Sequence, residues 1–303
     1  MITLTFKPDS EIAVDLVLDI GNSRTCGILF EEGSFTKGMM MELRDLSMPW
    51  ICYENSAFDM RVVFRKADFG NDMLPGEDLF TWKSFVRVGE EAKRLIYRSI
   101  DDAGLADKTT NYSSPKRYLW DKKEFEGLWE SLVTVTDAMN VNYTNDIYIH
   151  GLSELFDDDG SYNPNRKDGL ILLNGGNHRY SRSSLMTFAY IEIFQQAMLQ
   201  INSVRYRNKW GKVDCRRYIR NVIITCPTAM PLKEQVFLRQ SATDAYDALT
   251  RCLPDIRKAE IIPSAHAVGI TDPNSAGRTW AYDEASCCQM VYLCAEIKQR
   301  YGG

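Results

Sequence analysis

A carboxylate and a glycine turn near the start of the 303-residue chain are suited to holding a phosphate group and its metal ion. Asp19 closes an otherwise apolar stretch. Because burying an unpaired carboxylate is costly, it needs a partner, and a hydrated magnesium ion is a good one. The turn behind it, Gly21 to Thr25, can aim successive backbone N–H groups at a phosphate, and Gly21 has no Cβ to block that approach. An aspartate that caps the turn of a plain hairpin explains the same residues equally well.

Two further charged positions could complete such a site. Lys116 and Arg117 lie in the segment SSPKRYLW, and a lysine can neutralise charge on a transferring phosphoryl group or orient an attacking water. Glu284 stands at the start of the last predicted helix, where it could position a hydrolytic or metal-bound water. By themselves these residues favour simpler explanations, namely a surface basic pair beside an aromatic anchor and an acid that stabilises a helix dipole.

The residues around Asp19 predict a β-hairpin. Val14 to Ile20 is apolar and rich in good strand formers, and a short Gly-Asn turn leads to a second such stretch at Thr25 to Phe30. Phe35 to Leu43 can supply a third strand. Residues 14–43 therefore predict a meander with Asp19 near the end of its first strand.

The second half of the chain alternates helices and strands, which is typical of α/β layers on a sheet. Between Ser183 and Asn202, apolar residues recur at three- and four-residue steps, so a helix with one buried face is expected. The other elements expected in this half are a strand over Tyr218–Cys226, a helix over Pro231–Leu249, a strand over Ala259–Ile262 and a helix over 282–301 that Asp283 caps.

Residues 44–180 are less regular and are expected to form an insertion subdomain, with the core in residues 1–43 and 181–303. Helices are expected within the insertion at Glu90–Ala103 and Glu124–Ala138. The predicted fold is α/β, with a three-strand meander and two α/β units on one mixed sheet.

Composition narrows the class of protein. The net charge is −5 with acidic and basic residues interspersed, so no nucleic-acid partner is expected. The one basic run, Arg205 to Arg220, is expected to be a solvated connection before a strand. The start of the chain has no signal-peptide pattern and no apolar run is long enough to span a bilayer, so a cytoplasmic protein without a membrane span is expected.

The eight cysteines and three histidines predict no metal or redox site. No C-x-x-C pair occurs, and most cysteines lie in apolar runs, so they are expected to be small buried hydrophobes in a reducing compartment. Cys287 and Cys288 are expected to pack in the core. His150, His178 and His266 do not have the spacing of metal ligands.

Five segments, in order along nearly the whole chain, resemble the first lobe of the actin, sugar-kinase and heat-shock-chaperone superfamily. LVLDIGNSRTCGIL at 16–29 is similar to the first phosphate motif of that superfamily. RVGEEAKR at 87–94 and KRYL at 116–119 are similar to the chaperones' G-x-x-A-K stretch and to the K-R-L-I-G stretch that holds their catalytic lysine. NVIITCPTAMPLKEQ at 221–235 resembles their VITVPAYF…Q strand and helix start, and 260–262 followed by DEAS at 283–286 resembles RIINEPTAA with an insertion between.

This resemblance implies a ribonuclease-H-like lobe that binds ATP and magnesium. Asp19 would hold magnesium, through water, and Lys116 would act at the γ-phosphate. Glu284 would help to orient the hydrolytic water. The residues that would contact the nucleotide are Gly21, Asn22, Ser23, Arg24 and Arg117.

A closer resemblance is to the SrfB family, large proteins of Gram-negative bacteria described as virulence factors. It is carried by the segments VDLVLDIGNSRTCGIL, SSPKRYLWD, RYSRSSLMTFAYIEIFQQAMLQINS and YDEASCCQMVYL. This resemblance implies an association with virulence and leaves the biochemical activity open.

The second phosphate motif of the superfamily, a D-x-G-G-G-T-type turn, does not occur in residues 1–303. The chain is therefore expected to be the first lobe of a longer protein, with nucleotide bound between it and a second lobe. In that arrangement the full-length protein would be an ATP-driven conformational switch and a possible ATPase, and the first lobe alone would be inactive.

Two other functions stay open. One is an inactive scaffold of the same fold that acts through protein partners, which Arg24 in the turn and Pro115 before the lysine favour. The other is a small-molecule kinase of the same superfamily, for which the sequence offers no identifiable substrate base.

Overall fold

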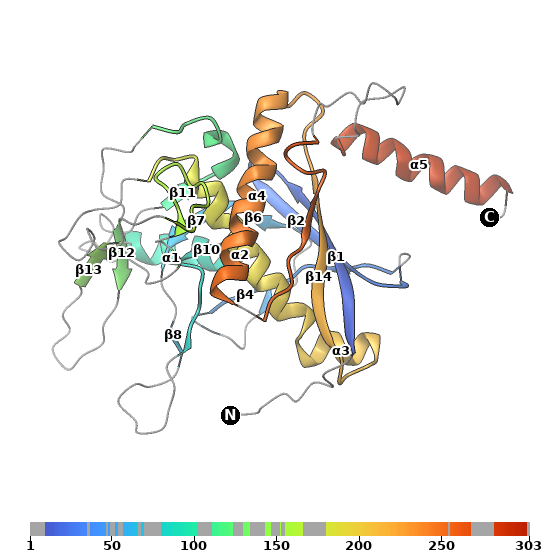
Figure 1. Cartoon of the computed structure of the whole chain (residues 1–303), viewed down its shortest axis with the longest axis horizontal. Helices are drawn as coiled ribbons and strands as arrows, with labels where there is room; N and C mark the ends of the chain where they lie inside the picture. The colour runs from blue at the N-terminus through green and yellow to red at the C-terminus, as the bar shows by residue number, and fades with distance from the viewer. Residues whose placement is uncertain are drawn as a thin grey trace.

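The chain forms a mixed α/β structure, seen here in a computed structural model (Figure 1). The residues that the structure describes are 10–34, 37–46, 48, 52–53, 57–65, 68–69, 80–101, 111–123, 130–133, 143–146, 152, 155–165, 180–253, 255–267 and 282–301.

A mixed sheet forms the centre, with strand order β15-β14-β1-β2-β3 and a short β6 paired to β2. The antiparallel strands are β1 (Glu11–Ile20), β2 (Arg24–Glu31), β3 (Met39–Met40) and β6 (Phe58–Asp59). The strands β14 (Arg216–Thr225) and β15 (Glu260–Ile262) continue the sheet from β1, each parallel to its neighbour. In the β1–β14 register Glu11 lies opposite Arg216 and Asp19 opposite Thr225, so both strands end at the same edge.

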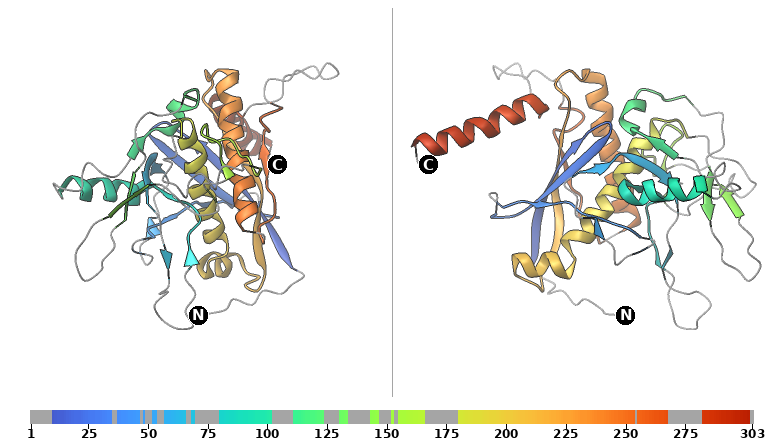
Figure 2. Two further views of the ribbon diagram at one scale, coloured as in Figure 1. Left: turned by 60° about the vertical axis from the view of Figure 1, so that its left-hand side comes forward. Right: turned by 180° about the vertical axis from the view of Figure 1, so that it is seen from behind.

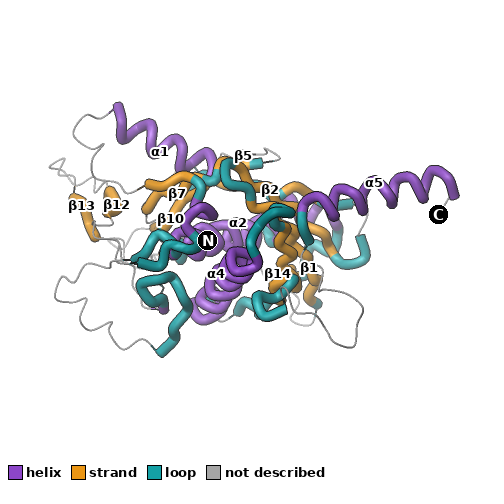
Figure 3. The backbone as a smooth tube through the Cα atoms, turned by 90° about the horizontal axis from the view of Figure 1, so that it is seen from above, coloured by secondary structure: helices purple, strands orange, loops and turns teal. Residues whose placement is uncertain are grey.

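Two long helices cover one face of this sheet. They are α2 (Ser184–Ile201), which precedes β14 and continues into the short α3 (Val204–Trp210), and α4 (Leu232–Cys252), which connects β14 to β15. The last helix, α5 (Glu284–Tyr301), begins at the sheet edge and extends away from the remaining described structure (Figures 1 and 3).

The segment between β3 and α2 lies mainly on the far side of α2 from the central sheet (Figure 2). It contains α1 (Gly89–Asp101) and the 3-10 turn η1 (Pro115–Tyr118). Its three-stranded sheet is built from β10 (Val86–Val88), β7 (Arg61–Phe64) and β11 (Asn111–Ser113). Its two-stranded pairs are β4 (Leu43–Arg44) with β5 (Cys52–Tyr53), β8 (Asp68–Phe69) with β9 (Phe80–Thr81), and β12 (Glu130–Val133) with β13 (Tyr143–Asp146).

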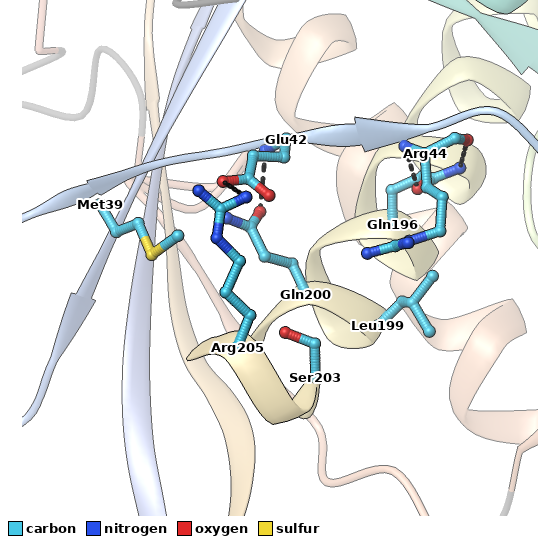
Figure 4. A pocket seen from close by; sticks show the side chains of 8 residues that line it. All are labelled: Met39, Glu42, Arg44, Gln196, Leu199, Gln200, Ser203 and Arg205. Atoms are coloured by element: carbon cyan, nitrogen blue, oxygen red, sulfur yellow. Dashed lines mark hydrogen bonds and ion pairs between the residues drawn. The ribbon is translucent and has the colours of Figure 1, made fainter. Parts of the chain in front are cut away.

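Helix α2 is buried on nearly every side because it lies between the two layers. Its polar side chains bond to backbone groups of the segment that covers it. The amide of Gln200 accepts from Glu42 N at 2.8 Å, and the amide of Gln196 accepts from Arg44 N at 3.0 Å and donates to Arg44 O at 2.9 Å (Figure 4). Gln200 also donates to Met40 O at 2.9 Å. These two glutamine side chains take the place of a neighbouring strand, because they form hydrogen bonds with backbone groups of residues 40–44, where β3 ends.

Most elements expected in the second half are confirmed. The helix over 183–202, the strand ending at 226, the helix from 231 and the strand at 259–262 all occur, with ends shifted by a few residues. Helix α1 also confirms the expectation at Glu90–Ala103. Asp283 caps the last helix through a bond from Ser286 N to Asp283 Oδ1 at 3.0 Å.

Three expectations about secondary structure were wrong or incomplete. Within the helix expected at 124–138, residues 130–133 form strand β12, because pairing with β13 outweighs local helix propensity; the rest of that segment lies outside the described residues. The third meander strand is only Met39–Met40, and residues 35–36 of the expected strand are also outside the described part. Helix α2 was expected to have one buried face and has several.

The basic run Arg205 to Arg220 is not simply solvated. Residues 204–210 form α3, whose first turn is capped by a bond from Tyr206 N to Ser203 Oγ at 3.2 Å. Arg207 and Arg217 are buried, and Arg217 pairs with Glu31 at 3.0 Å.

The expectation for the cysteines holds only in part. Cys226 is buried in the sheet, and Cys287 is half-buried at the start of α5. Cys288 and Cys294 are exposed, because α5 lies against little else in the described structure. Core packing of Cys287 and Cys288 is therefore wrong for Cys288.

Candidate functional site

Asp19 lies at the edge where β1 and β14 both end. Leu18 and Ile20 point into the core, so alternation along the strand turns Asp19 to the opposite, exposed face. Its Oδ1 accepts a hydrogen bond of 3.0 Å from Oγ1 of Thr225, the residue opposite it in β14. The carboxylate is thus solvated and oriented, and the argument that burial forces it to find a partner does not apply.

The turn from Gly21 to Arg24 requires a glycine at its first position. A Cβ on Gly21 would lie 2.2 Å from the backbone oxygen of Arg24, a distance that no side chain tolerates. The side chains of Asn22 and Ser23 are exposed beside the turn. The turn is therefore tightly closed and accessible from outside, as a phosphate-binding turn must be.

Hydrogen bonds between backbone groups join this turn to the loop that carries Lys116. Met60 N donates to Ser23 O at 2.9 Å, and Ser114 N donates to Met60 O at 2.8 Å. Ser114 then takes a left-handed conformation with φ of 57°, and Pro115 opens the turn η1. This connection places Lys116 beside the end of β1.

The ammonium group of Lys116 lies at the end of β1, against the main-chain oxygen of the residue after Asp19. Lys116 is only 7% exposed, and its Nζ donates to Ile20 O at 2.5 Å. Burial lowers the pKa of Lys116, and the negative charges of Glu284 and then Asp19 oppose this shift. The ammonium group of Lys116 therefore interacts electrostatically with both carboxylates.

Glu284 is brought to the same place by the end of β14. Cys226 N donates to Tyr282 O at 3.3 Å, and Glu284 N donates to Cys226 O at 2.9 Å, so residues 282–284 add a short bridge beside the strand. Helix α5 starts there, with the half-buried Glu284 in its first turn. We call Asp19, Lys116 and Glu284 the strand-end cluster.

The structure thus brings together three residues that are far apart in sequence, and it separates two others from them. Arg24 is 72% exposed at its side chain and pairs with Asp59 at 3.5 Å, a contact that directs the guanidinium along β6. Arg117 is exposed, whereas its neighbour Lys116 is buried. Neither arginine has a described contact with the strand-end cluster.

Two contributors to this site were missed at the level of sequence. Thr225 orients Asp19, and the signal for it was the register of two parallel strands that end together. Glu234, in the first turn of α4, is a further negative charge that acts on Lys116. Its position in a first helical turn was visible, but its distance from Lys116 depends on how α4 packs.

Metal ligands are sparse in this region. Across the described ranges, no group of three or more His, Cys, Asp and Glu side chains is arranged to hold a metal ion. His266 is exposed after β15, and the predictions for His150 and His178 lie outside the described residues.

Comparison with known protein families identifies the family of this chain. The family model for virulence factor SrfB matches residues 2–303. The chain belongs to the SrfB family of virulence factors. In this SrfB chain the strand-end cluster is drawn from three segments of the matched region. A comparison with curated proteins finds no match.

One further property of this SrfB chain concerns membranes. Among the helices that the structure describes, none combines the length and the apolar character needed to cross a bilayer.

Proposed function

We propose that this SrfB-family protein binds Mg-ATP at the strand-end cluster and changes conformation with its nucleotide state. The observation that carries the proposal is the convergence of Asp19, Lys116 and Glu284 at one sheet edge. Lys116 Nζ lies 2.5 Å from the main-chain oxygen of Ile20, the residue after Asp19. The backbone N–H of Glu284 donates to Cys226 O at 2.9 Å, at the end of the adjacent strand. Charged residues at the carboxyl ends of neighbouring strands are a frequent basis for ligand sites in α/β sheets.

The strand order supports the finer assignment, a ribonuclease-H-like first lobe of the actin and heat-shock-chaperone kind. An antiparallel meander, β1-β2-β3, is extended on its β1 side by β14 and β15, each parallel to its neighbour. Helices α2 and α4 precede and follow β14. This order of elements supports the lobe that the sequence resemblance implied.

Each residue has a role in this proposal that follows from its position. The closed turn at Gly21, with Asn22 and Ser23, presents backbone N–H groups to phosphate oxygens. Lys116, buried and beside two carboxylates, supplies positive charge at the γ-phosphate, and Glu284 orients water. Arg24 and Arg117 contact phosphate only if their exposed side chains move.

Asp19 suits magnesium that is bound mostly through water. Magnesium in nucleotide sites keeps several waters and uses one or two protein carboxylates together with phosphate oxygens. Asp19 is exposed, and Thr225 bonds to its Oδ1 only, so the carboxylate can accept from magnesium-bound waters. The nucleotide would supply the phosphate oxygens for the turn at Gly21, and magnesium would supply the positive charge beside Asp19.

The test is ATP binding by calorimetry, with and without magnesium, on the longest protein in which this chain occurs, because a second lobe is expected to contribute contacts. We expect magnesium-dependent binding that Asp19→Ala weakens at least tenfold, which is about 1.4 kcal/mol. Asp214→Ala, which changes an exposed aspartate in the loop before β14, is the matched control and should bind like the wild type. The proposal fails if the folded wild type binds no nucleotide or if both variants bind equally.

A scaffold without turnover is the second candidate, and the surface of α5 favours it. Five large apolar side chains are exposed on this helix, Met290, Val291, Tyr292, Leu293 and Ile297. Exposed apolar surface of this kind marks sites of protein association. Partner binding that is unchanged in an Asp19→Ala, Lys116→Ala double variant would support the scaffold over the switch.

A further inference from the structure

A cavity of about 490 Å³ lies at the end of the sheet opposite the strand-end cluster. It opens where α2 passes into α3, between the start of β14 and the loop that follows α4. Its volume is within the range of about 300–1,000 Å³ that is common for small-molecule sites. Nothing in the proposed nucleotide site uses it.

The walls of this cavity are largely apolar. Met198 and Leu199 come from α2, Ile219 from β14, Ile256 from the loop after α4, and Trp82 from the covering segment. Apolar walls of this kind favour a ligand with an apolar body, because binding removes the apolar surfaces of the ligand and of the cavity wall from water.

A cation lies among these apolar walls. Arg216, the first residue of β14, donates from Nη2 to the main-chain oxygen of Asp255 at 2.7 Å. Among the described residues it forms no ion pair with a carboxylate, whereas the neighbouring Arg217 pairs with Glu31 and Arg257 with Glu11. The charge of Arg216 is therefore available to an anionic group.

The cavity also has a buried polar group without a partner. Tyr246 on α4 lines it, is 1% exposed, and has no hydrogen-bond partner for its hydroxyl among the described residues. An unpaired buried hydroxyl is unfavourable, and a bound molecule is one way to satisfy it. Burial raises the pKa of this phenol, which keeps it a neutral donor.

We propose that this cavity binds an amphipathic carboxylate of the fatty-acid class, with the chain against Met198, Leu199 and Ile219 and the carboxylate at Arg216. A linear chain suits these largely apolar walls, because the polar side chains of Gln195, Asn202 and Ser203, which also line the cavity, already bond to backbone groups of the protein. A single unpaired guanidinium suits a ligand with one negative end, since it can bond a carboxylate through two N–H groups.

Two features separate this site from its surroundings. It lies at the opposite end of β1 and β14 from Asp19, about 26 Å away at about 3.3 Å per residue, so binding at the two sites can be measured independently. The adjoining cavity in Figure 4 shares Leu199 and Ser203 with it but holds only about 20 Å³, room for about one water. The smaller cavity is therefore no alternative site for the chain.

Calorimetric titration of the full chain with octanoate, decanoate and dodecanoate tests the apolar part of the proposal. Each added methylene should tighten binding about fourfold until the cavity is full. Saturable binding that does not depend on chain length, or no saturable binding, would overturn the proposal.

Two pairs of variants test the location. Arg216→Gln should weaken decanoate at least fivefold and leave decanol unchanged, while Arg251→Gln, an exposed arginine on α4, should change neither. Leu199→Glu, with a carboxylate at the cavity wall, should abolish decanoate binding, and Leu232→Glu, also at an exposed leucine, should not. Equal effects within either pair would place the ligand elsewhere and reject the site, provided that circular dichroism shows each variant folded.

Discussion

Two non-glycine residues at the site hold left-handed backbone conformations. Ser114 has φ of 57° and lies two positions before Lys116, and Tyr282 has φ of 55° and lies two positions before Glu284. Conformations of this kind cost of order 1–3 kcal/mol each and tend to occur at functional sites. Both arms of the strand-end cluster thus depend on a local bend that the surrounding structure must maintain.

The turn residue Gly21 allows a direct test of this local geometry. Gly21→Ala should lower the free energy of unfolding by about 1–3 kcal/mol, because a Cβ at this position meets Arg24 O at 2.2 Å and the turn must open. Urea denaturation measures the change. Asn22→Ala, at the exposed neighbouring position, should stay within about 0.5 kcal/mol of the wild type; an equal loss in both variants would contradict a specific requirement for glycine.

A buried carboxylate on α4 predicts a pH dependence of stability. Burial raises the pKa of Asp244 to about 6, although bonds from the Gln240 side chain and the Tyr162 backbone oppose the shift. The native state therefore holds a proton that the unfolded state releases near pH 4. This contribution, about 2–3 kcal/mol, is complete below about pH 4 and is lost as the pH rises through about 6.

Denaturation across this range can isolate the group. Between pH 4 and 7, Asp244→Asn should show a flatter dependence of unfolding free energy on pH than the wild type. Asp214→Asn, which changes an exposed aspartate, should follow the wild-type curve. A wild-type slope that persists in Asp244→Asn would assign the proton to another residue.

At the scale of elements, α2 determines how the covering segment is attached. Gln196 and Gln200, one helical turn apart, replace the strand that would otherwise continue the sheet beyond Met40. Each amide both donates and accepts, which matches the alternation of backbone groups along residues 40–44. An apolar side chain in their place would leave buried backbone groups unpaired.

Removing one of these amides should therefore be costly. Gln200→Ala should destabilise the protein by about 1–3 kcal/mol, since it leaves Glu42 N and Met40 O without their partner. Thermal denaturation provides the measurement. Gln289→Ala on the exposed surface of α5 is the matched control and should leave the melting temperature nearly unchanged; similar losses in both would reject the bridging role.

At the scale of the whole molecule, the segment between β3 and α2 shares one core with the central sheet. Arg87 of β10 is buried and pairs with Glu192 of α2 at 3.0 Å, and Trp82 Nε1 donates to the same carboxylate at 2.8 Å. Phe64 and Phe85 from the same segment lie against the Phe188 ring of α2. A buried ion pair and a shared aromatic cluster predict that both layers unfold together.

Coincident transitions would show this cooperativity. Tryptophan fluorescence and far-ultraviolet circular dichroism should give superimposable denaturation curves for the wild type. Glu192→Ala should lower stability by about 1–3 kcal/mol, because Trp82 Nε1 loses its acceptor and the buried guanidinium of Arg87 keeps only Glu91, at 4.0 Å, as a carboxylate partner. Two separate transitions in the wild type would mean that the layers are independent units.

The amino-acid pattern alone predicted the elements whose side chains repeat with a clear period. The helix α2, the strand β14, the helix α4 and the capped start of α5 follow from apolar spacing and from proline and aspartate at their ends. These are local properties, because hydrophobic periodicity and capping depend on neighbours within a few residues. The same local information left simpler explanations for Asp19, Lys116 and Glu284. It was the resemblance to the superfamily that implied a shared site.

Only the tertiary structure decided which of those charges share a site and which surfaces are buried. Strand pairing brought Thr225 to Asp19, and a backbone connection through Met60 carried Lys116 to the end of β1. The packing of α2 between two layers buried helix faces that its apolar spacing had not predicted to be buried. Such contacts join residues up to about two hundred positions apart. Their formation depends on the free energy of the whole packed core, which no local pattern of side chains contains.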